Sequence, residues 1–203
     1  MRAPIAYVFL HMHATASDTA ANELPVLNGT RLRLRGIETD DFDAFYALHS
    51  DPQAMRYWSF PAWTAREQAQ AYFETACSSR DPGRMLCWAM ADIADDALIG
   101  AATLCDIDRE QGRATVGYVL SRDRWGRGLA REAVSLMLVH AFDTLALRRV
   151  EADIDPRNEA SCRLVERVGF RREGLLRERW HTAGELCDTV MYGLLAREFV
   201  RDA

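Results

Sequence analysis

A strand, a glycine-rich turn, an amphipathic helix and a second strand follow one another between residues 113 and 155. The apolar run RATVGYVL (113–120) precedes two glycines, Gly126 and Gly128, and RRVEADID (148–155) follows the helix. The apolar face of that helix consists of Leu129, Ala133, Leu136, Met137, Ala141 and Phe142. Since a crossover through a helix returns the chain in the same direction, the two strands must lie parallel in one sheet.

The other predicted strands are joined by short turns, which favours antiparallel pairing. They comprise residues 31–35, 84–93, 97–108 and two strands around the turn TAGE (182–185). Helices are expected over residues 40–51, from a capping box formed by Thr64 and Glu67, and from Asn158 to Gly169. This pattern predicts an α/β (α+β) fold, with a central mixed, mostly antiparallel sheet of about seven strands and flanking helices.

Length and composition favour a single domain, because the chain has 203 residues of which 49% are hydrophobic and 27% charged. Residues 14–28 are small and polar, so residues 1–29 are expected to form a flexible extension before one domain at 30–203. The apolar stretch IAYVFL is far shorter than the ~20 residues that span a bilayer. Five scattered cysteines indicate reduced thiols, and a cytoplasmic protein is expected.

The net charge of −5 provides no attractive field for nucleic acid or an anionic membrane, so neither is expected as a partner. No metal site is expected either, because His11 and His13 have no carboxylate or cysteine nearby.

The glycine-rich turn at 126–128 is typical of a loop that binds phosphate at a helix N-terminus. A P-loop is excluded because it requires lysine, and all 25 basic residues are arginine. A dinucleotide-binding turn requires a small residue where Arg131 stands. An acyl-CoA loop is the third kind of anion-binding turn.

The segments GYVLSRDRWGRGLAREAV (117–134) and VEADIDPRNEASCRLVERVGFRREG (150–174) resemble the GNAT superfamily of acyl-CoA N-acyltransferases. The resemblance extends over about residues 30–197 and is greatest to the Rim-type subgroup, which contains the ribosomal-protein N-terminal acetyltransferases. It implies that acetyl-CoA is the cosubstrate and that no metal takes part. The pyrophosphate would lie on a loop and helix start made of Arg124, Trp125, Gly126, Arg127, Gly128, Leu129 and Ala130.

Asp123 departs from the glutamine or arginine that the family has at the start of this loop. A carboxylate facing a pyrophosphate is unfavourable, so neighbouring arginines would have to offset it, or Asp123 would have to point outward as a helix cap.

The resemblance further implies that the two parallel strands splay apart. Backbone groups of about Val119 and Leu120 would then bind the acyl carbonyl and the pantetheine arm, and Asn158 would contact that arm.

For the chemistry, the family commonly has a tyrosine as general acid where this chain has Val165. Ser161, which matches the Rim-type pattern N-x-x-S, is our candidate for meeting the departing thiolate. The glutamate that Rim-type proteins often carry as a base is Thr115 here. Glu151 and Asp153, with Asp155, share one face of their strand and are candidate bases, either directly or through ordered water.

Acceptor-binding candidates come from two segments, YWSFPAW (57–63) and RERWHTAGELCD (177–188). They are Tyr57, Trp58, Trp63, Trp180, His181 and Asp188. With Glu178 nearby, such a groove suits a cationic amine.

The resemblance together with these residues implies an N-acetyltransferase that moves an acetyl group from acetyl-CoA to a small-molecule amine or a peptide N-terminus by direct transfer. A monomer or a homodimer is expected. The alternative is an acyl-CoA-binding sensor or partner protein with the same fold and little turnover.

Overall fold

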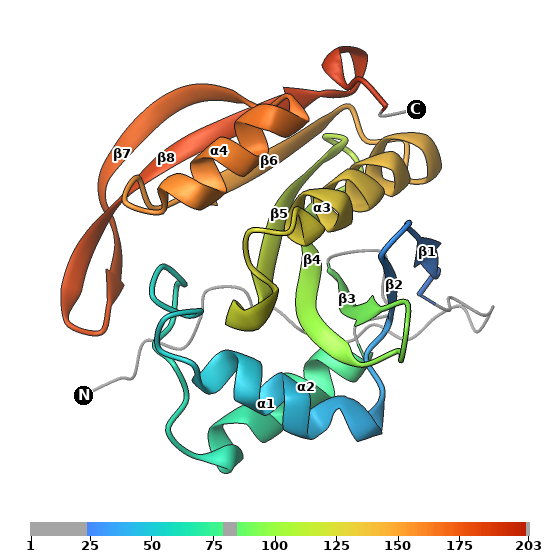
Figure 1. The fold of residues 1–203 in the computed structure, drawn as a ribbon. Helices are drawn as coiled ribbons and strands as arrows, with labels where there is room; N and C mark the ends of the chain where they lie inside the picture. Colours follow the sequence, from blue (N-terminus) through green and yellow to red (C-terminus); the bar gives the residue numbers. More distant parts are fainter. Residues whose placement is uncertain (1–23, 79–84, 202–203) are drawn as a thin grey trace.

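The computed structural model describes residues 24–78 and 85–201, which build one eight-stranded sheet with helices on both faces (Figure 1). The strands are β1 (Leu27–Asn28), β2 (Leu32–Gly36), β3 (Leu86–Asp92), β4 (Leu98–Asp108), β5 (Arg113–Leu120), β6 (Arg149–Ile154), β7 (Arg171–Thr182) and β8 (Glu185–Leu195). The helices are α1 (Phe42–Ser50), α2 (Arg66–Ser78), α3 (Leu129–Val139) and α4 (Glu159–Val168). The strand order is β1-β2-β3-β4-β5-β6-β8-β7. The predicted mixed α/β fold is confirmed.

The β5–β6 pair is the parallel one, and all other neighbouring strands pair antiparallel. The parallel register runs only from Arg113, opposite Arg149, to Thr115, opposite Glu151. Beyond Thr115 the two strands separate, as Figure 1 shows, and α3 connects them on one face of the sheet. The predicted splay is therefore present.

The sheet has one strand more than the sequence predicted, because β1 lies within the stretch expected to be a linker. Leu27 pairs with Leu34 of β2, and the indole nitrogen of Trp88 donates to the carbonyl of Pro25 at 2.9 Å. A two-residue strand leaves no periodic pattern to read. The part of the expected extension before residue 24 lies outside the described residues.

Two apolar clusters hold the layers together. The larger one packs α3 and α4 on the sheet and contains the fully buried Trp88 and Leu138, while the smaller one packs α1 and α2 on the opposite face through Phe45 and Phe73. Each large apolar side chain that is fully buried contributes about 1.5–3 kcal/mol. The sheet, and with it the splayed strands, is thus fixed from both sides.

The helix boundaries agree with the sequence at α4 and differ at α2. The side chain of Asn158 accepts the N–H of Ser161, and Gly169 ends α4 with φ of +109°. At α2 the predicted capping box of Thr64 with Glu67 is wrong, because Gln68 performs that role: its Oε1 accepts the N–H groups of Thr64 at 2.8 Å and of Ala65 at 3.1 Å. The helix therefore begins at Arg66, which places Gln68 in its third position.

His49 of α1 is 1% exposed, and its Nδ1 donates to the carbonyl of Phe45 at 2.9 Å. Burial lowers the pKa of His49 from 6.5 to about 4. Between these values the unfolded chain binds a proton that the folded protein excludes, so the free energy of unfolding should fall as pH falls, by up to about 3 kcal/mol. Urea unfolding at pH 7 and pH 4.5 measures this, and His49→Leu should remove that part of the pH dependence.

The matched control is His181→Gln, since His181 is exposed. This variant should keep the dependence of the wild type. An unchanged slope in His49→Leu would show that acidic groups alone cause it.

Candidate active site

The gap between β5 and β6 exposes backbone groups of β5. The N–H of Ser121 donates to Ile99 of β4 at 2.9 Å, and backbone groups along a strand alternate in direction. Val119 therefore faces β4, and its carbonyl oxygen lies 2.5 Å from where a Cβ on Gly100 would be. Tyr118 and Leu120 face the gap instead. Of the two residues expected to offer backbone groups there, only Leu120 has the required direction.

The loop between β5 and α3 depends on its two glycines. Gly126 and Gly128 have φ of +73° and +75°, which glycine adopts without a steric cost, and a Cβ on Gly126 would meet nothing within 4 Å. Gly128 is the N-cap of α3, so the N–H groups of Leu129 and Ala130 belong to the first turn, which has no partners within the helix. A left-handed turn, an open front and first-turn amides together fit a phosphate group.

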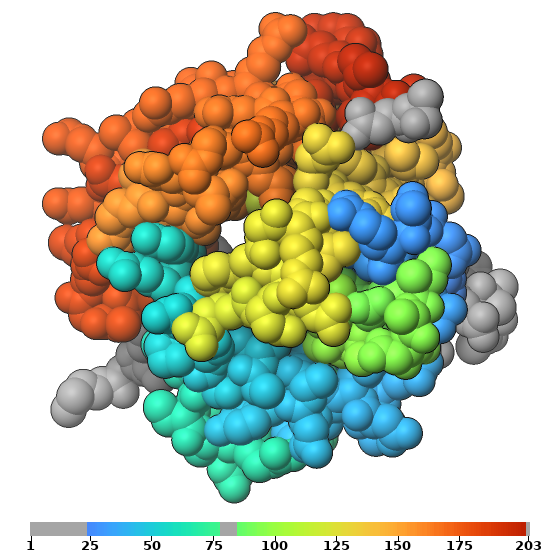
Figure 2. Space-filling model, in the orientation of Figure 1, coloured from blue at the N-terminus to red at the C-terminus, as the bar shows by residue number. Residues whose placement is uncertain are grey.

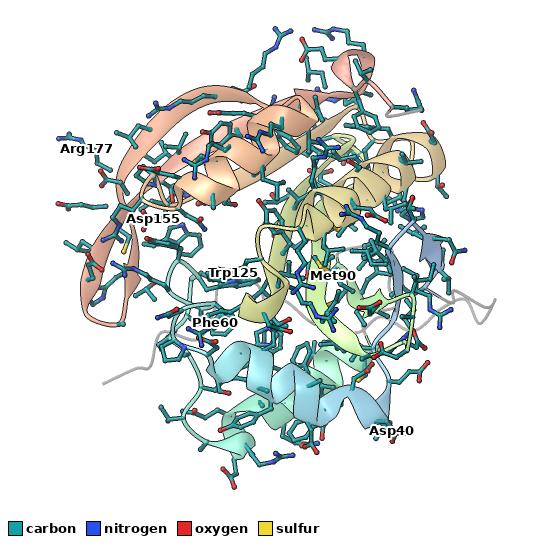
Figure 3. The ribbon with its side chains drawn as sticks, in the orientation of Figure 1. Asp40, Phe60, Met90, Trp125, Asp155 and Arg177 are labelled. Atoms are coloured by element: carbon teal, nitrogen blue, oxygen red, sulfur yellow. The ribbon has the colours of Figure 1, made fainter. Side chains whose placement is uncertain are left out.

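Trp125, labelled in Figure 3, projects from this loop with 48% of its surface exposed. Its indole N–H donates to the carbonyl of Leu120 at 2.7 Å. This hydrogen bond fixes the loop to the end of β5. It also engages the backbone carbonyl of Leu120, which faces the gap.

The arginines of the loop are largely engaged by carboxylates of the protein. Arg124 pairs with Asp92 at 2.6 Å, and Arg122 pairs with Asp51 at 2.8 Å. Asp123 is exposed, and its Oδ2 lies 3.2 Å from the Nε of Arg124. It points outward, but it caps neither the short 3₁₀ turn at Arg122–Arg124 nor α3, because α3 starts only after Gly128.

A clamp that the sequence did not predict joins the segment just before β2 to the first turns of α3. The Oε1 of Glu132 accepts the N–H groups of Thr30 at 2.6 Å and Arg31 at 2.8 Å, and its Oε2 accepts the Nε of Arg31 at 2.8 Å. Burial acts to raise the pKa of Glu132, but these hydrogen bonds outweigh it and hold the pKa below its usual value. Arg31 also donates to the carbonyl of Arg127 at 2.5 Å, so the clamp fixes the loop as well.

At the other edge of the gap, α4 presents Ser161 one turn from its start. The Ser161 hydroxyl lies 2.5 Å from the hydroxyl of Tyr118 on β5. Val165, one turn further, is fully buried and offers no donor. Tyr118 was not among the predicted site residues, although its place in an alternating strand puts it on the face that α4 covers.

The candidate bases lie on the opposite face of β6, as the alternation predicted, since Val150, Ala152 and Ile154 fill the core. Each of them already accepts hydrogen bonds. Glu151 accepts Arg149 at 2.7 Å, and Asp153 accepts Thr189 at 2.7 Å, Arg179 at 3.0 Å and Trp180 at 3.1 Å.

Asp155, labelled in Figure 3, lies at the turn into α4. Burial acts to raise its pKa, but the hydrogen bonds from Arg157 outweigh that effect and lower it. Asp155 is therefore a structural anion of this turn.

The aromatic acceptor candidates separate into two groups. Trp58 lies over the face of β5 that α1 and α2 cover, because a Cβ on Gly117 would be 3.9 Å from its ring, and Trp180 donates to Asp153 of β6. Trp63 instead packs among the rings of the smaller core cluster, 4.8 Å from His49.

The remaining candidates belong to the β7–β8 hairpin and the loop that faces it. Asp188 accepts the N–H of Glu178 at 2.9 Å across the hairpin, and His181 is exposed near its tip. Tyr57 lies 6.0 Å from the guanidinium of Arg157. Within residues 24–78 and 85–201, no hydrogen bond or ring contact joins these three side chains to one another.

The hairpin tip meets the loop after α1, because Thr182 donates to the carbonyl of Ser59 at 3.4 Å. Figure 2 shows an opening between the loop after α1 (teal), the loop that carries Trp125 (yellow) and the segment around α4 (orange). The hairpin tip and the loop after α1 are thus in direct contact.

Within residues 24–78 and 85–201, no three His, Cys, Asp or Glu side chains are grouped to hold a metal ion. No helix in these ranges has the length and apolar character needed to cross a membrane.

Comparison with known proteins agrees with this geometry. The family described as "Acetyltransferase (GNAT) domain" matches residues 31–171. The uncharacterized N-acetyltransferase p20 of Bacillus licheniformis is 35% identical over 83% of this chain and 95% of its own, and the spermidine N(1)-acetyltransferase of Escherichia coli is 21% identical over 84% and 89%. The structure of Mycobacterium smegmatis RimJ in complex with CoA-disulfide has the same fold, with a TM-score of 0.78 and 23% identity over 87% of this chain and 90% of that one.

The splayed parallel strands, the glycine loop at the start of α3 and the match over residues 31–171 lead to one assignment. This chain belongs to the GNAT family of acetyltransferases, and it is an N-acyltransferase.

Proposed function

We propose that the protein transfers an acetyl group from acetyl-CoA directly to a primary amine, with no covalent enzyme intermediate. The observation that carries the proposal is the gap beyond Thr115, which has the phosphate-binding turn at one end and the Tyr118–Ser161 pair beside it. The curated relatives p20 and spermidine N(1)-acetyltransferase support an N-acetyl transfer.

Acetyl-CoA would supply the activated acetyl thioester. Its pyrophosphate would accept N–H groups from the loop at 126–128 and the first turn of α3, and the side chains of Arg124, Trp125 and Arg127 would border it. Leu120 and Asn158 would contact the pantetheine arm from the two sides of the gap. This arrangement uses partial charges of the backbone more than arginine charges, since Arg124 is already paired.

Ser161 donates a hydrogen bond to the departing sulfur in this proposal. Glu151 and Asp153 act on the acceptor through ordered water, because their oxygens already accept hydrogen bonds from the protein. The two carboxylates attract a cationic acceptor to the gap.

Trp58 and Trp180 are the acceptor-binding residues that the geometry supports best, because Trp58 lies over Gly117 of β5 and Trp180 donates to Asp153 of β6. Tyr57, His181 and Asp188 would line the route towards it. The acceptor class is a peptide N-terminus or a small amine, which would approach the gap past the β7–β8 hairpin and the loop after α1 that it contacts.

A thiol-release assay with purified protein, acetyl-CoA and a panel of amines tests the function. The panel contains polyamines, amino acids, amine antibiotics and N-terminal peptides. At least one of them should raise thiol release about tenfold or more above the amine-free control. Tight acetyl-CoA binding without such release across the panel would support the acyl-CoA-binding sensor instead.

A further inference from the structure

We propose that Tyr118 is a positioning residue that directs the Ser161 hydroxyl into the gap, where the pair stabilises a thiolate by hydrogen bonding. The inference rests on the proposed function and extends it. Because α4 has no tyrosine that could assist the departing sulfur, the proposal gives this supporting role to Tyr118 of β5.

The pair bridges the open part of the gap. Tyr118 lies beyond Thr115, where the pairing of β5 with β6 ends, and Ser161 lies in the first turn of the helix that follows β6. Their oxygens are 2.5 Å apart, which is at the short end for a hydrogen bond between hydroxyls. Within residues 24–78 and 85–201, the Ser161 hydroxyl makes no other hydrogen bond.

The direction of this hydrogen bond follows from acidity. A phenol gives up its proton more readily than an aliphatic hydroxyl, so Tyr118 is the better donor and Ser161 the better acceptor. When Ser161 accepts from Tyr118, its own proton remains available for a further acceptor. Asn158 fixes the backbone of the same residue, since its side chain accepts the N–H of Ser161 at 3.2 Å.

Tyr118 stays protonated over the working range of such an enzyme. Burial raises its pKa to about 12, against a smaller lowering by the hydrogen bond to Ser161. The titratable group that acts on it from α4 is the thiol of Cys162. A thiol has a pKa of about 8.5, so Tyr118 does not surrender its proton to a thiolate.

Neither Tyr118 nor Ser161 loses a proton in the proposed transfer step. As the carbon–sulfur bond breaks, Ser161 donates its hydrogen bond to the sulfur, which keeps the bonding electron pair. Water takes the proton that the amine loses, and water then returns a proton to the sulfur. Tyr118 and Ser161 end the step as they began it.

Binding of free CoA tests the pair without turnover. If the pair stabilises the thiolate, CoA affinity measured by calorimetry should rise about tenfold between pH 7 and pH 9, relative to desulfo-CoA, which lacks the sulfur. Ser161→Ala should remove this rise, and Tyr118→Phe should reduce it to about twofold or less. The matched control is Tyr192→Phe, because Tyr192 is also buried but bonds Glu166 at 2.9 Å, and it should behave as wild type.

A double-mutant cycle distinguishes positioning from packing. Tyr118→Phe should lower kcat about tenfold in the wild-type background and leave it unchanged in the Ser161→Ala background. Ser161→Thr, which retains a hydroxyl, should restore the effect of Tyr118→Phe. Equal losses in the two backgrounds, or an unaltered pH dependence of CoA binding in Tyr118→Phe, would overturn the proposal. If no amine gives turnover, the proposed function fails, and the ratio of CoA to desulfo-CoA binding still decides the role of the pair.

Discussion

Replacing Gly128 with aspartate is expected to weaken acetyl-CoA binding by about 100-fold or more while leaving the fold intact. Gly128 caps α3 with φ of +75°, and a Cβ there would be 3.4 Å from the guanidinium of Arg31. An aspartate side chain would accept the first-turn N–H groups, and its charge would repel a pyrophosphate. Aspartate tolerates left-handed backbone better than most residues, so we expect the stability of the helix to change by about 1 kcal/mol at most. Isothermal calorimetry measures the affinity.

Gly184→Asp is the matched control for this variant. Gly184 has φ of +82° in the β7–β8 turn, with nothing within 4 Å of an added Cβ. It receives the same charge and a similar backbone strain away from α3, so its acetyl-CoA affinity should remain within about twofold of wild type. Retained affinity in Gly128→Asp would mean that the phosphates bind elsewhere.

Removing the carboxylate of Asp41 is expected to lower the free energy of unfolding by about 3–5 kcal/mol. Its two oxygens accept hydrogen bonds from the two terminal nitrogens of Arg35, at 2.7 and 3.0 Å. Both side chains are about nine-tenths buried. These hydrogen bonds raise the pKa of Arg35 against the effect of its burial. In Asp41→Ala the guanidinium stays buried, with the partly exposed Asp96 as its remaining anion. Urea unfolding measures the loss.

The control for this prediction is Asp43→Ala, since Asp43 pairs with Arg66 on the surface and its side chain is 83% exposed. Its loss should be within about 0.5 kcal/mol. Replacing both partners, as in Arg35→Met with Asp41→Leu, should recover most of the stability, because no unpaired charge remains buried. A small loss in Asp41→Ala would show that Asp96 alone is enough for Arg35.

Periodic and local signals predicted most of the fold. The strand predicted over 113–120 has the bounds of β5, and the cap at Asn158 and the stop at Gly169 are where the sequence placed them. These features depend on neighbours within a few residues, which a single sequence contains. β1 and the cap by Gln68 were missed because a two-residue pairing and a one-residue shift of a capping motif have no periodicity to detect.

The candidate site was predicted as a set of segments, and its side-chain contacts were not. Glu132 accepts a hydrogen bond from the backbone of Thr30, 102 residues away, and Tyr118 forms a hydrogen bond with Ser161, 43 residues away. Asp153 was predicted on the correct face of β6, but its donors Arg179 and Thr189 belong to strands whose register sets the distance. Such contacts can be predicted only when the order of the strands in the sheet and the curvature of the strands are known.

Strands β1–β5 form one half of the sheet, and β6, β8 and β7 form the other. The backbone pairing that joins the two halves, between β5 and β6, consists of three residue pairs. A molecule lying along both edges of the gap adds the cross-links that the ladder omits beyond Thr115. By mass action, the free energy with which it binds also resists separation of the two halves. Under the proposed function, bound acyl donor therefore adds to the apolar packing that already holds the two halves together.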